Sequence, residues 1–327
     1  MKPSGTLFLR RSEVAALADF PAYTTAVEGA FRAHAEGRSL HPGLMHVDAI
    51  DGEFHIKAGG LREPEPRFAI KINGSFFQNR TRFAMPNIQG AILISDASHG
   101  YPLCVMDSME VTIQRTGAAT AVAAKYLARA DSSTVTICGV GNQGRIQLKA
   151  VAGTLPIRQA FAWDLSIDRA RAFAEAMTLE LGFPVTAVEE IGPSDVVVTC
   201  TPSKSAFLMA QAVRPGTFVA AVGSDSSDKQ EVDPHLLAAS IVVGDLIDQI
   251  VHVGDTHHAI AQGLMTRAQI HAELGQIITG SKPGRTTPGQ TIVFDSTGTA
   301  LQDVAAASMI YEAARAAGKG VWIDLAS

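Results

Sequence analysis

Hydrophobic and polar positions follow different patterns in the two parts of the chain. Up to about Leu103, short strand-like runs are interrupted by Gly, Pro and Asn, which is typical of an α+β region. These runs cover residues 53–57, 67–72 and 91–94. From about Thr116, β-branched runs alternate with alanine-rich segments of helical spacing. That alternation predicts a parallel sheet with crossover helices.

The alternating pattern after Thr116 also predicts individual helices and strands. Between residues 168 and 181, apolar side chains recur every three to four positions, as on one face of a helix. A last helix is predicted from Leu301 to Gly318, where the glycine ends it. The predicted strands cover residues 134–138, 159–163, 185–188, 196–200, 217–222, 241–243 and 291–294.

A glycine-rich turn follows the first of these strands. Residues 139–144 read Gly-Val-Gly-Asn-Gln-Gly, open a helix, and precede Asp164 by 20 residues counted from the last glycine. This context is that of a dinucleotide-binding Rossmann turn. Gly139 would make the tight turn, Gly141 would let the backbone approach a pyrophosphate, and Gly144 would allow close helix–strand packing. The alternative is a glycine turn that binds no cofactor.

Asp164 bears on the identity of the cofactor. A carboxylate at the end of the second strand accepts hydrogen bonds from the adenosine ribose hydroxyls of NAD and repels the 2′-phosphate of NADP. We therefore predict NAD(H) rather than NADP(H). The alternative is that Asp164 merely caps a helix that begins near Ser166.

Composition and charge narrow the class of protein. The chain has 327 residues, 46% of them hydrophobic and 18% charged, which is typical of a globular protein. Its formal net charge is −5, whereas a nucleic-acid-binding domain usually carries a strongly basic surface. No run reaches the roughly 18 apolar residues of a membrane span. We expect neither a nucleic acid nor a membrane as a partner.

The N-terminus and the cysteines point to a cytoplasmic location. Arg10 and Arg11 interrupt the stretch where a signal peptide needs apolar residues. The three cysteines are Cys104, Cys138 and Cys200, which lie far apart in apolar stretches. Buried reduced thiols fit this pattern better than disulfides or a zinc site.

Four segments resemble those of one family. They cover residues 102–107, 115–128, 139–144 and 223–231, and in this order they resemble the ornithine cyclodeaminase/μ-crystallin family from about Phe68 to Ala307. The resemblance implies a homodimer. It also implies a Rossmann doubly wound parallel sheet over residues 116–305 and an α+β substrate-binding and dimerisation domain over residues 1–115, completed by the C-terminal helix within 306–327. The family includes cyclodeaminases, alanine dehydrogenases, imine reductases and the thyroid-hormone binder μ-crystallin, so the substrate stays open.

The resemblance also implies roles for single residues. Lys71 and Arg115 match the residues that contact the substrate carboxylate, Asp225 matches the catalytic aspartate, and Thr297 lies near the substrate. We assign catalysis to Asp225 and Lys71. The residues expected to contact the cofactor are Thr116, Gly139, Gly141, Asn142, Gln143, Gly144, Asp164, Thr201, Lys229 and Ser296.

The same residues suit hydride exchange between an amino acid and NAD. Paired cations hold a carboxylate by charge-assisted hydrogen bonds, and a carboxylate beside the cofactor can move a proton on the imine nitrogen. Asp225 follows a strand at its carboxyl end, where open α/β sheets bind ligands. The alternatives are that Lys71 is an exposed strand lysine, Arg115 a structural ion-pair partner, and Asp225 an ordinary turn residue.

Two departures from the family pattern bear on the substrate. The arginine expected near Gly43 or Leu44 is missing, and Lys57 stands where the family has proline. Our hypothesis is that Lys57 replaces the lost cation, either on the α-carboxylate or on a second acidic group; the alternative is a surface lysine. Phe54 occupies the position where an ornithine enzyme needs an acid, and Glu53 would face the other way.

A cluster of His252, Asp255, His257 and His258 resembles a metal site only in composition. Its histidine spacing does not match one helix face, so we expect a solvated loop or dimer contact there and no metal site in the protein.

We predict an NAD(H)-dependent oxidoreductase that reduces an imine to an L-amino acid, or runs the reverse oxidative deamination. The imine is either cyclic or formed from an oxo acid and ammonia. The alternatives are an ornithine cyclodeaminase-type lyase with internally recycled NAD and a non-catalytic ligand binder.

Overall fold

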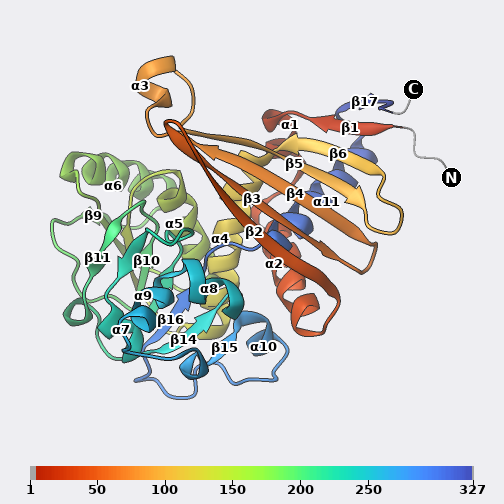
Figure 1. The fold of residues 1–327 in the computed structure, drawn as a ribbon. Helices are drawn as coiled ribbons and strands as arrows, with labels where there is room; N and C mark the ends of the chain where they lie inside the picture. Colours follow the sequence, from red (N-terminus) through yellow and green to blue (C-terminus); the bar gives the residue numbers. More distant parts are fainter. Residues whose placement is uncertain (1–4, 326–327) are drawn as a thin grey trace. The chain divides into compact units, whose positions relative to one another are not determined.

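The computed structural model describes residues 5–325, and contacts within the chain define two compact units (Figure 1). Unit 1 comprises Met1–Arg115 and Thr299–Ser327, and unit 2 comprises Thr116–Gly298. The chain leaves unit 1 within helix α4 (Ser108–Leu127) and re-enters it just before helix α11 (Ala300–Ala317). The functional division predicted at residues 115 and 305 stays a prediction.

Unit 1 is built on one sheet of seven strands in the order β17-β1-β6-β5-β4-β3-β2. Neighbouring strands are antiparallel except for β1 and β6. Its strands are β1 (Thr6–Leu9), β2 (Ser39–Ala49), β3 (Gly52–Leu61), β4 (Arg67–Ser75), β5 (Ile88–Asp96), β6 (Pro102–Asp107) and β17 (Val321–Ile323). Its other helices are α1 (Arg11–Leu17), α2 (Phe20–Ala35) and α3 (Asn79–Phe83).

The strand-like runs predicted in this region at residues 53–57, 67–72 and 91–94 are parts of β3, β4 and β5. The strands themselves are longer than these runs. Glycines that would end an isolated strand are tolerated within them, because pairing with neighbouring strands satisfies the hydrogen bonds of the backbone there.

The two faces of this sheet differ in what covers them. Helix α11 packs against β2, β3, β4 and β5 and against α2 (Figure 1). The predicted Gly318 ends this helix in the left-handed conformation, at φ +62°. Side chains alternate between faces along a strand, so Ile92 and Ile94 are fully buried, whereas Met45, Val47 and Ile72 are between 42 and 55% exposed. One face of the sheet therefore belongs to the core of unit 1. The other face carries apolar side chains that are exposed in the single chain.

Unit 2 contains an eight-stranded sheet in the order β15-β14-β16-β12-β10-β7-β8-β9, and all its strands are parallel. The strands are β7 (Thr134–Cys138), β8 (Gln159–Trp163), β9 (Val185–Ala187), β10 (Val196–Thr199), β12 (Phe218–Ala221), β14 (Ile241–Gly244), β15 (Ala272–Glu273) and β16 (Ile292–Asp295), with β11 (Lys204–Leu208) and β13 (Gln230–Val232) paired separately. The helices are α5 (Asn142–Thr154), α6 (Ile167–Leu181), α7 (Pro234–Ala238), α8 (Ile247–Val253), α9 (Asp255–Ala261) and α10 (Leu274–Ile278), with short 3₁₀ turns at Ala210–Ala212 and Arg267–Gln269.

The order of these strands confirms the predicted doubly wound fold. The chain winds outward from β7 to β8 and β9, and then returns to β10 on the other side of β7. The order reverses between β7 and β10, and ligands bind at the carboxyl ends of the strands beside such a reversal.

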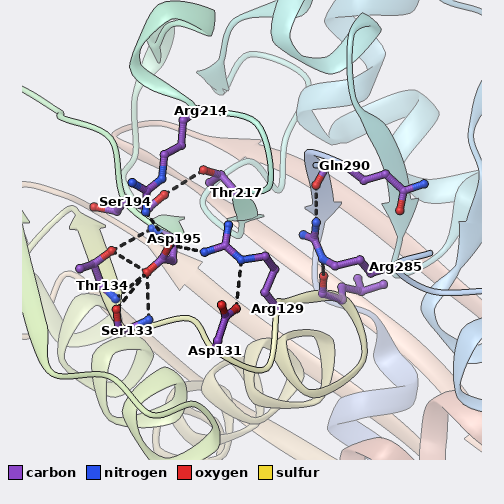
Figure 2. A network of polar contacts seen from close by, with 11 residues as sticks. Arg129, Asp131, Ser133, Thr134, Ser194, Asp195, Arg214, Thr217, Arg285 and Gln290 are labelled. Atoms are coloured by element: carbon purple, nitrogen blue, oxygen red, sulfur yellow. Dashed lines mark hydrogen bonds and ion pairs between the residues drawn. The ribbon is translucent and has the colours of Figure 1, made fainter. Parts of the chain in front are cut away.

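The amino ends of β7 and β10 are held together by a buried carboxylate (Figure 2). Asp195 accepts hydrogen bonds from the backbone of Ser133 and Thr134 and ion-pairs with Arg129 at 2.6 Å and with Arg214. Burial would raise its pKa, but these hydrogen bonds outweigh burial and hold the pKa well below its usual range. The network lies at the edge of the sheet opposite the glycine turn, so its role is structural.

Candidate active site

Three buried cations lie together in unit 1. Lys57 on β3 and Lys71 on β4 are direct partners across the two strands, and Arg115 lies on α4. The exposed fractions of these residues are 4, 2 and 4%. The alternatives of a surface lysine at Lys57 and at Lys71 are therefore wrong.

The cations are arranged around the carboxylate of Asp303 on α11. The Nζ atom of Lys71 lies 2.7 Å from Oδ2, and Nε of Arg115 lies 2.9 Å from Oδ1. A second nitrogen of Arg115, Nη1, donates to Oε1 of Gln302 at 2.8 Å. Arg115 is thus a structural ion-pair partner, as the alternative held, and this geometry is compatible with a role in binding as well.

The pKa values show that positive charge is in excess at Lys71. Burial lowers the pKa of Lys71, repulsion from Arg115 and Lys57 lowers it further, and attraction by Asp303 only partly compensates, so that the pKa falls to about 7. Burial would raise the pKa of Asp303, but Arg115, Lys71 and Lys57 together hold it below its usual value. An added carboxylate would relieve this repulsion, so the cluster is suited to bind an anion.

The glycine turn of unit 2 has the geometry that a dinucleotide needs. Gly139 has φ +100°, and a Cβ on it would lie 2.9 Å from the carbonyl oxygen of Cys200. A Cβ on Gly144 would lie 2.2 Å from the carbonyl oxygen of Gly139, whereas a Cβ on Gly141 would meet no atom within 4 Å. The open side of the turn is thus at Gly141, the N-cap of α5, where helix N–H groups lack intrahelical acceptors. Asn142 and Gln143 occupy the first turn of this helix.

Asp164 lies beside the same turn. Its Oδ2 accepts from the backbone N–H of Val140 at 3.2 Å, and its Oδ1 accepts from Ser166 N–H at 3.1 Å and lies 3.5 Å from Nη1 of Arg169. Helix α6 has Ser166 as its N-cap, so Asp164 does not cap it, and that alternative is wrong. The turn and Asp164 together therefore fit the pyrophosphate and ribose of NAD.

The predicted catalytic aspartate is ion-paired. Nζ of Lys229 lies 2.6 Å from Oδ1 of Asp225, whose side chain is 33% exposed. Their loop is fixed by Glu231, which accepts from Gly223 N–H at 2.9 Å and from N–H and Oγ1 of Thr201 at 2.6 and 2.8 Å. Burial raises the pKa of Glu231. Glu231 thus connects the loop after β10, which carries Thr201, to the loop after β12, which carries Asp225 and Lys229, at the carboxyl edge of the sheet.

The remaining predicted residues occupy two further places in unit 2. Ser296 and Thr297 are buried, and their hydroxyls donate to Asp245 at 3.2 to 3.4 Å. Thr116 is half-buried on α4, and its carbonyl accepts from Thr120. The structure thus explains how residues 296 and 297 are held, and their contacts with ligands stay predictions.

The prediction of a solvated loop at residues 252–258 is wrong, and the alternative of a dimer contact there stays a prediction. These residues belong to α8 and α9, and Asp255 is fully buried, accepting from the backbone N–H groups of Glu231 and Val232 at 2.7 and 2.9 Å. His257 and His258 hydrogen-bond to backbone carbonyls at 2.6 and 2.8 Å. The cluster is therefore part of the packing around the Asp225 loop.

Sequence reasoning missed the acidic residues that organise these sites. Asp303 and Gln302 form a polar pair inside an otherwise apolar, alanine-rich stretch of α11, and that break in the pattern was the signal available. Glu231 lies within the short strand β13 and Asp245 directly follows β14, and neither position carries a local signal of this kind.

The comparisons with known proteins identify the class. The chain matches the ornithine cyclodeaminase/mu-crystallin family over residues 5–318 and belongs to it. The resemblance found from its motifs is therefore confirmed.

Solved structures of three enzymes are similar over nearly the whole chain. An archaeal alanine dehydrogenase dimer with bound NAD is 32% identical, with a TM-score of 0.93 over 98% of this chain and 99% of that one. The Delta(1)-pyrroline-2-carboxylate reductase of Thermococcus litoralis, in complex with NADH and L-proline, is 30% identical, with a TM-score of 0.92 over 97 and 100% of the two chains. The iminosuccinate reductase of Paracoccus denitrificans, in complex with NAD+, is 30% identical, with a TM-score of 0.90 over 98 and 100%.

Among the described residues 5–325, no helix is both long and apolar enough to span a membrane.

Proposed function

We propose that this protein is an NAD(H)-dependent oxidoreductase that reduces an imine to an L-amino acid and catalyses the reverse oxidative deamination. The observation that carries the proposal is the buried group of Lys57, Lys71 and Arg115 around a single shared carboxylate, Asp303. Its positive charge suits the carboxylate that every amino-acid or imino-acid substrate carries. The three similar enzymes act on such substrates according to their names.

The residues divide the work as follows. Lys71 and Arg115 bind the substrate carboxylate and orient the α-carbon, while Asp303 fixes the positions of both cations. Asp225 exchanges a proton with the substrate nitrogen, and Lys229 positions its carboxylate. Bound NADH supplies the hydride. The loop at residues 139–144 and Asp164 hold the cofactor.

Lys57 narrows the class of substrate. It is the direct cross-strand neighbour of Lys71, is also buried, and contributes to the positive charge that lowers the pKa of Lys71. Asp303 contacts Lys71 and Arg115 and lowers the cost of burying them. A substrate with a second carboxylate, such as an imino dicarboxylic acid, would use Lys57 as well.

The assembly we propose is a homodimer. Its support is the exposed apolar face of the unit 1 sheet, which includes Met45, Val47, Phe54 and Ile72. Such faces mark association surfaces, because isolated chains rarely expose contiguous apolar patches of this kind. We also propose a cytoplasmic location, which the three unpaired cysteines support.

An assay panel tests the function. NADH consumption is followed with pyrroline-2-carboxylate, piperideine-2-carboxylate, iminosuccinate, or pyruvate plus ammonia. We expect turnover with at least one of these imines. Release of ammonia and proline from ornithine without net NADH consumption would instead establish the lyase, and cofactor binding without either reaction would establish a ligand binder.

Two variants of the Asp225 loop make the test specific. Asp225→Asn should abolish turnover while leaving NADH binding intact. Asp228→Asn is the matched control, because Asp228 lies on the same loop, is about half exposed and pairs with the exposed Lys204. Equal activity of the two variants would contradict the role of Asp225.

A further inference from the structure

Four polar side chains form a patch at one end of the β2–β3 hairpin in unit 1. His46 and Asp48 on β2 lie directly opposite His55 and Glu53 on β3. Alternate residues of a strand share a face, so all four lie on the same face of the hairpin. This face is the one that carries Lys57, two residues beyond His55.

The imidazoles of the two histidines converge on one carboxylate. Nε2 of His55 lies 3.0 Å from Oε1 of Glu53, and Nε2 of His46 lies 3.3 Å from Oε2 of the same group. The two rings meet edge to face with their centroids 4.7 Å apart. One ligand atom from each residue can be chosen so that all three lie within 4.8 Å of one another.

These separations match the geometry of a metal site. In a tetrahedral zinc site with bonds of about 2.0–2.1 Å, neighbouring ligand atoms are about 3.3 Å apart. The nitrogen–oxygen distances of 3.0 and 3.3 Å, one to each oxygen of Glu53, are close to this value. The three ligand atoms that would bind one ion, one from each residue, lie within 4.8 Å of one another, so they would draw closer on binding. We propose that His46, Glu53 and His55 form a binding site for a divalent transition-metal ion such as Zn²⁺.

Burial and strand pairing prepare the site for an ion. His55 is only 5% exposed, and β3 is paired on both sides, so its backbone is fixed. The buried Nδ1 of His55 has no hydrogen-bond partner among residues 5–325, which leaves Nε2, the ligand atom, as the atom through which the ring is held. The loss of side-chain entropy of His55 when an ion binds is therefore small.

The chemistry of the ligands selects the ion. Two imidazole nitrogens and one carboxylate suit Zn²⁺, Co²⁺, Ni²⁺ or Cu²⁺, whereas Mg²⁺ and Ca²⁺ prefer all-oxygen sites. Oδ1 of the exposed Asp48 lies 3.3 Å from Nε2 of His46 and is within reach as a fourth ligand. The proposal depends only on the hairpin and holds whatever reaction the protein catalyses.

Metal titration of the full-length, tag-free protein after treatment with a chelator tests the site. Zn²⁺ binding is measured by calorimetry, and Co²⁺ binding by its visible absorption. We expect one ion per chain, competition between Zn²⁺ and Co²⁺, and no displacement by Mg²⁺. Absence of stoichiometric binding would overturn the proposal.

Variants locate the bound ion. His46→Ala and Glu53→Gln should each weaken Zn²⁺ binding by at least about tenfold, since loss of a residue that only supports a metal ligand already costs about 10- to 100-fold. His99→Ala is the matched control, because His99 is exposed, lies in the same unit and has a carboxylate neighbour, Asp96, at 3.5 Å. Circular dichroism checks that each variant is folded. Unchanged binding in folded His46→Ala and Glu53→Gln, or equal loss in His99→Ala, would refute the assignment.

Discussion

Replacement of Asp164 by serine tests how the chain selects between NAD(H) and NADP(H). Asp164 lies at the end of β8 and contacts the glycine turn through Val140 N–H at 3.2 Å. Serine keeps a hydroxyl for one hydrogen bond and removes the charge. Arg169, which lies 3.5 Å from the carboxylate, would then be released from this contact.

The size of the preference for NADH over NADPH can be estimated from the charges. A carboxylate and one phosphate charge about 4 Å apart repel by about 4 kcal/mol at an effective dielectric constant of about 20. Arg169 offsets part of this, although its side chain is 63% exposed and its ion pair is correspondingly weak. If about half of the repulsion remains, the wild-type protein disfavours NADPH by about 30-fold. Loss of a charge-assisted hydrogen bond to the ribose costs NADH a further ~1.5 kcal/mol, or about tenfold.

The assay is a fluorescence titration of each variant with NADH and NADPH. We expect the ratio of the two dissociation constants to shift toward NADPH by at least about a hundredfold in Asp164→Ser. Asp168→Ser is the matched control, because Asp168 lies in the first turn of α6, shortly after Asp164, is 87% exposed at the side chain and pairs with Arg171. An unchanged ratio, or equal weakening of both cofactors, would show that Asp164 only holds the glycine turn and would refute the reasoning.

Three further predictions follow from the buried charges. Lys57→Ala should raise the KM for a dicarboxylic imine by about 10- to 100-fold, the cost of one charge-assisted hydrogen bond, and an unchanged KM would contradict its proposed role. The pKa of Lys71 is lowered to about 7, so the lysine loses its charge as pH rises through this value, and kcat/KM should fall above about pH 7. Arginine stays charged at these pH values, so an active Lys71→Arg variant should not show that fall. Asp195→Ala should lower the free energy of unfolding by about 3 kcal/mol at pH 7 in chemical denaturation. The lowered pKa of Asp195 contributes stability above its unfolded-state pKa and loses it as pH falls, so the difference should shrink below about pH 4, and a constant difference would contradict this role.

Sequence patterns predicted most of unit 2 because its signals are local. The strand, the glycine turn, the helix and Asp164 lie within one βαβ segment, where backbone geometry and residue spacing are directly coupled. In unit 1 the same approach found parts of three strands and the last helix. The remaining strand residues are stabilised by pairing with neighbours rather than by their own propensity.

Some residues of the candidate sites could also be predicted from the sequence, whereas others could not. Resemblance to the family predicted functional roles for Lys71, Arg115 and Asp225, but it gave no account of what keeps them in position. Asp303 is distant in sequence from both cations that it contacts, and no spacing rule connects them. The same holds for the pairing of His46 with His55, which depends on the register of the hairpin.

The sequence by itself determined the parallel sheet, the glycine turn, the preference for NAD and the family, because each depends on local periodicity or on motifs in a fixed order. Only the tertiary structure decided which charges are buried together. Helix α11 brings Asp303 onto the face of the sheet that carries Lys57 and Lys71, and hairpin register places Glu53 between two histidines. Burial and electrostatic coupling depend on distances in space, and long-range packing sets those distances.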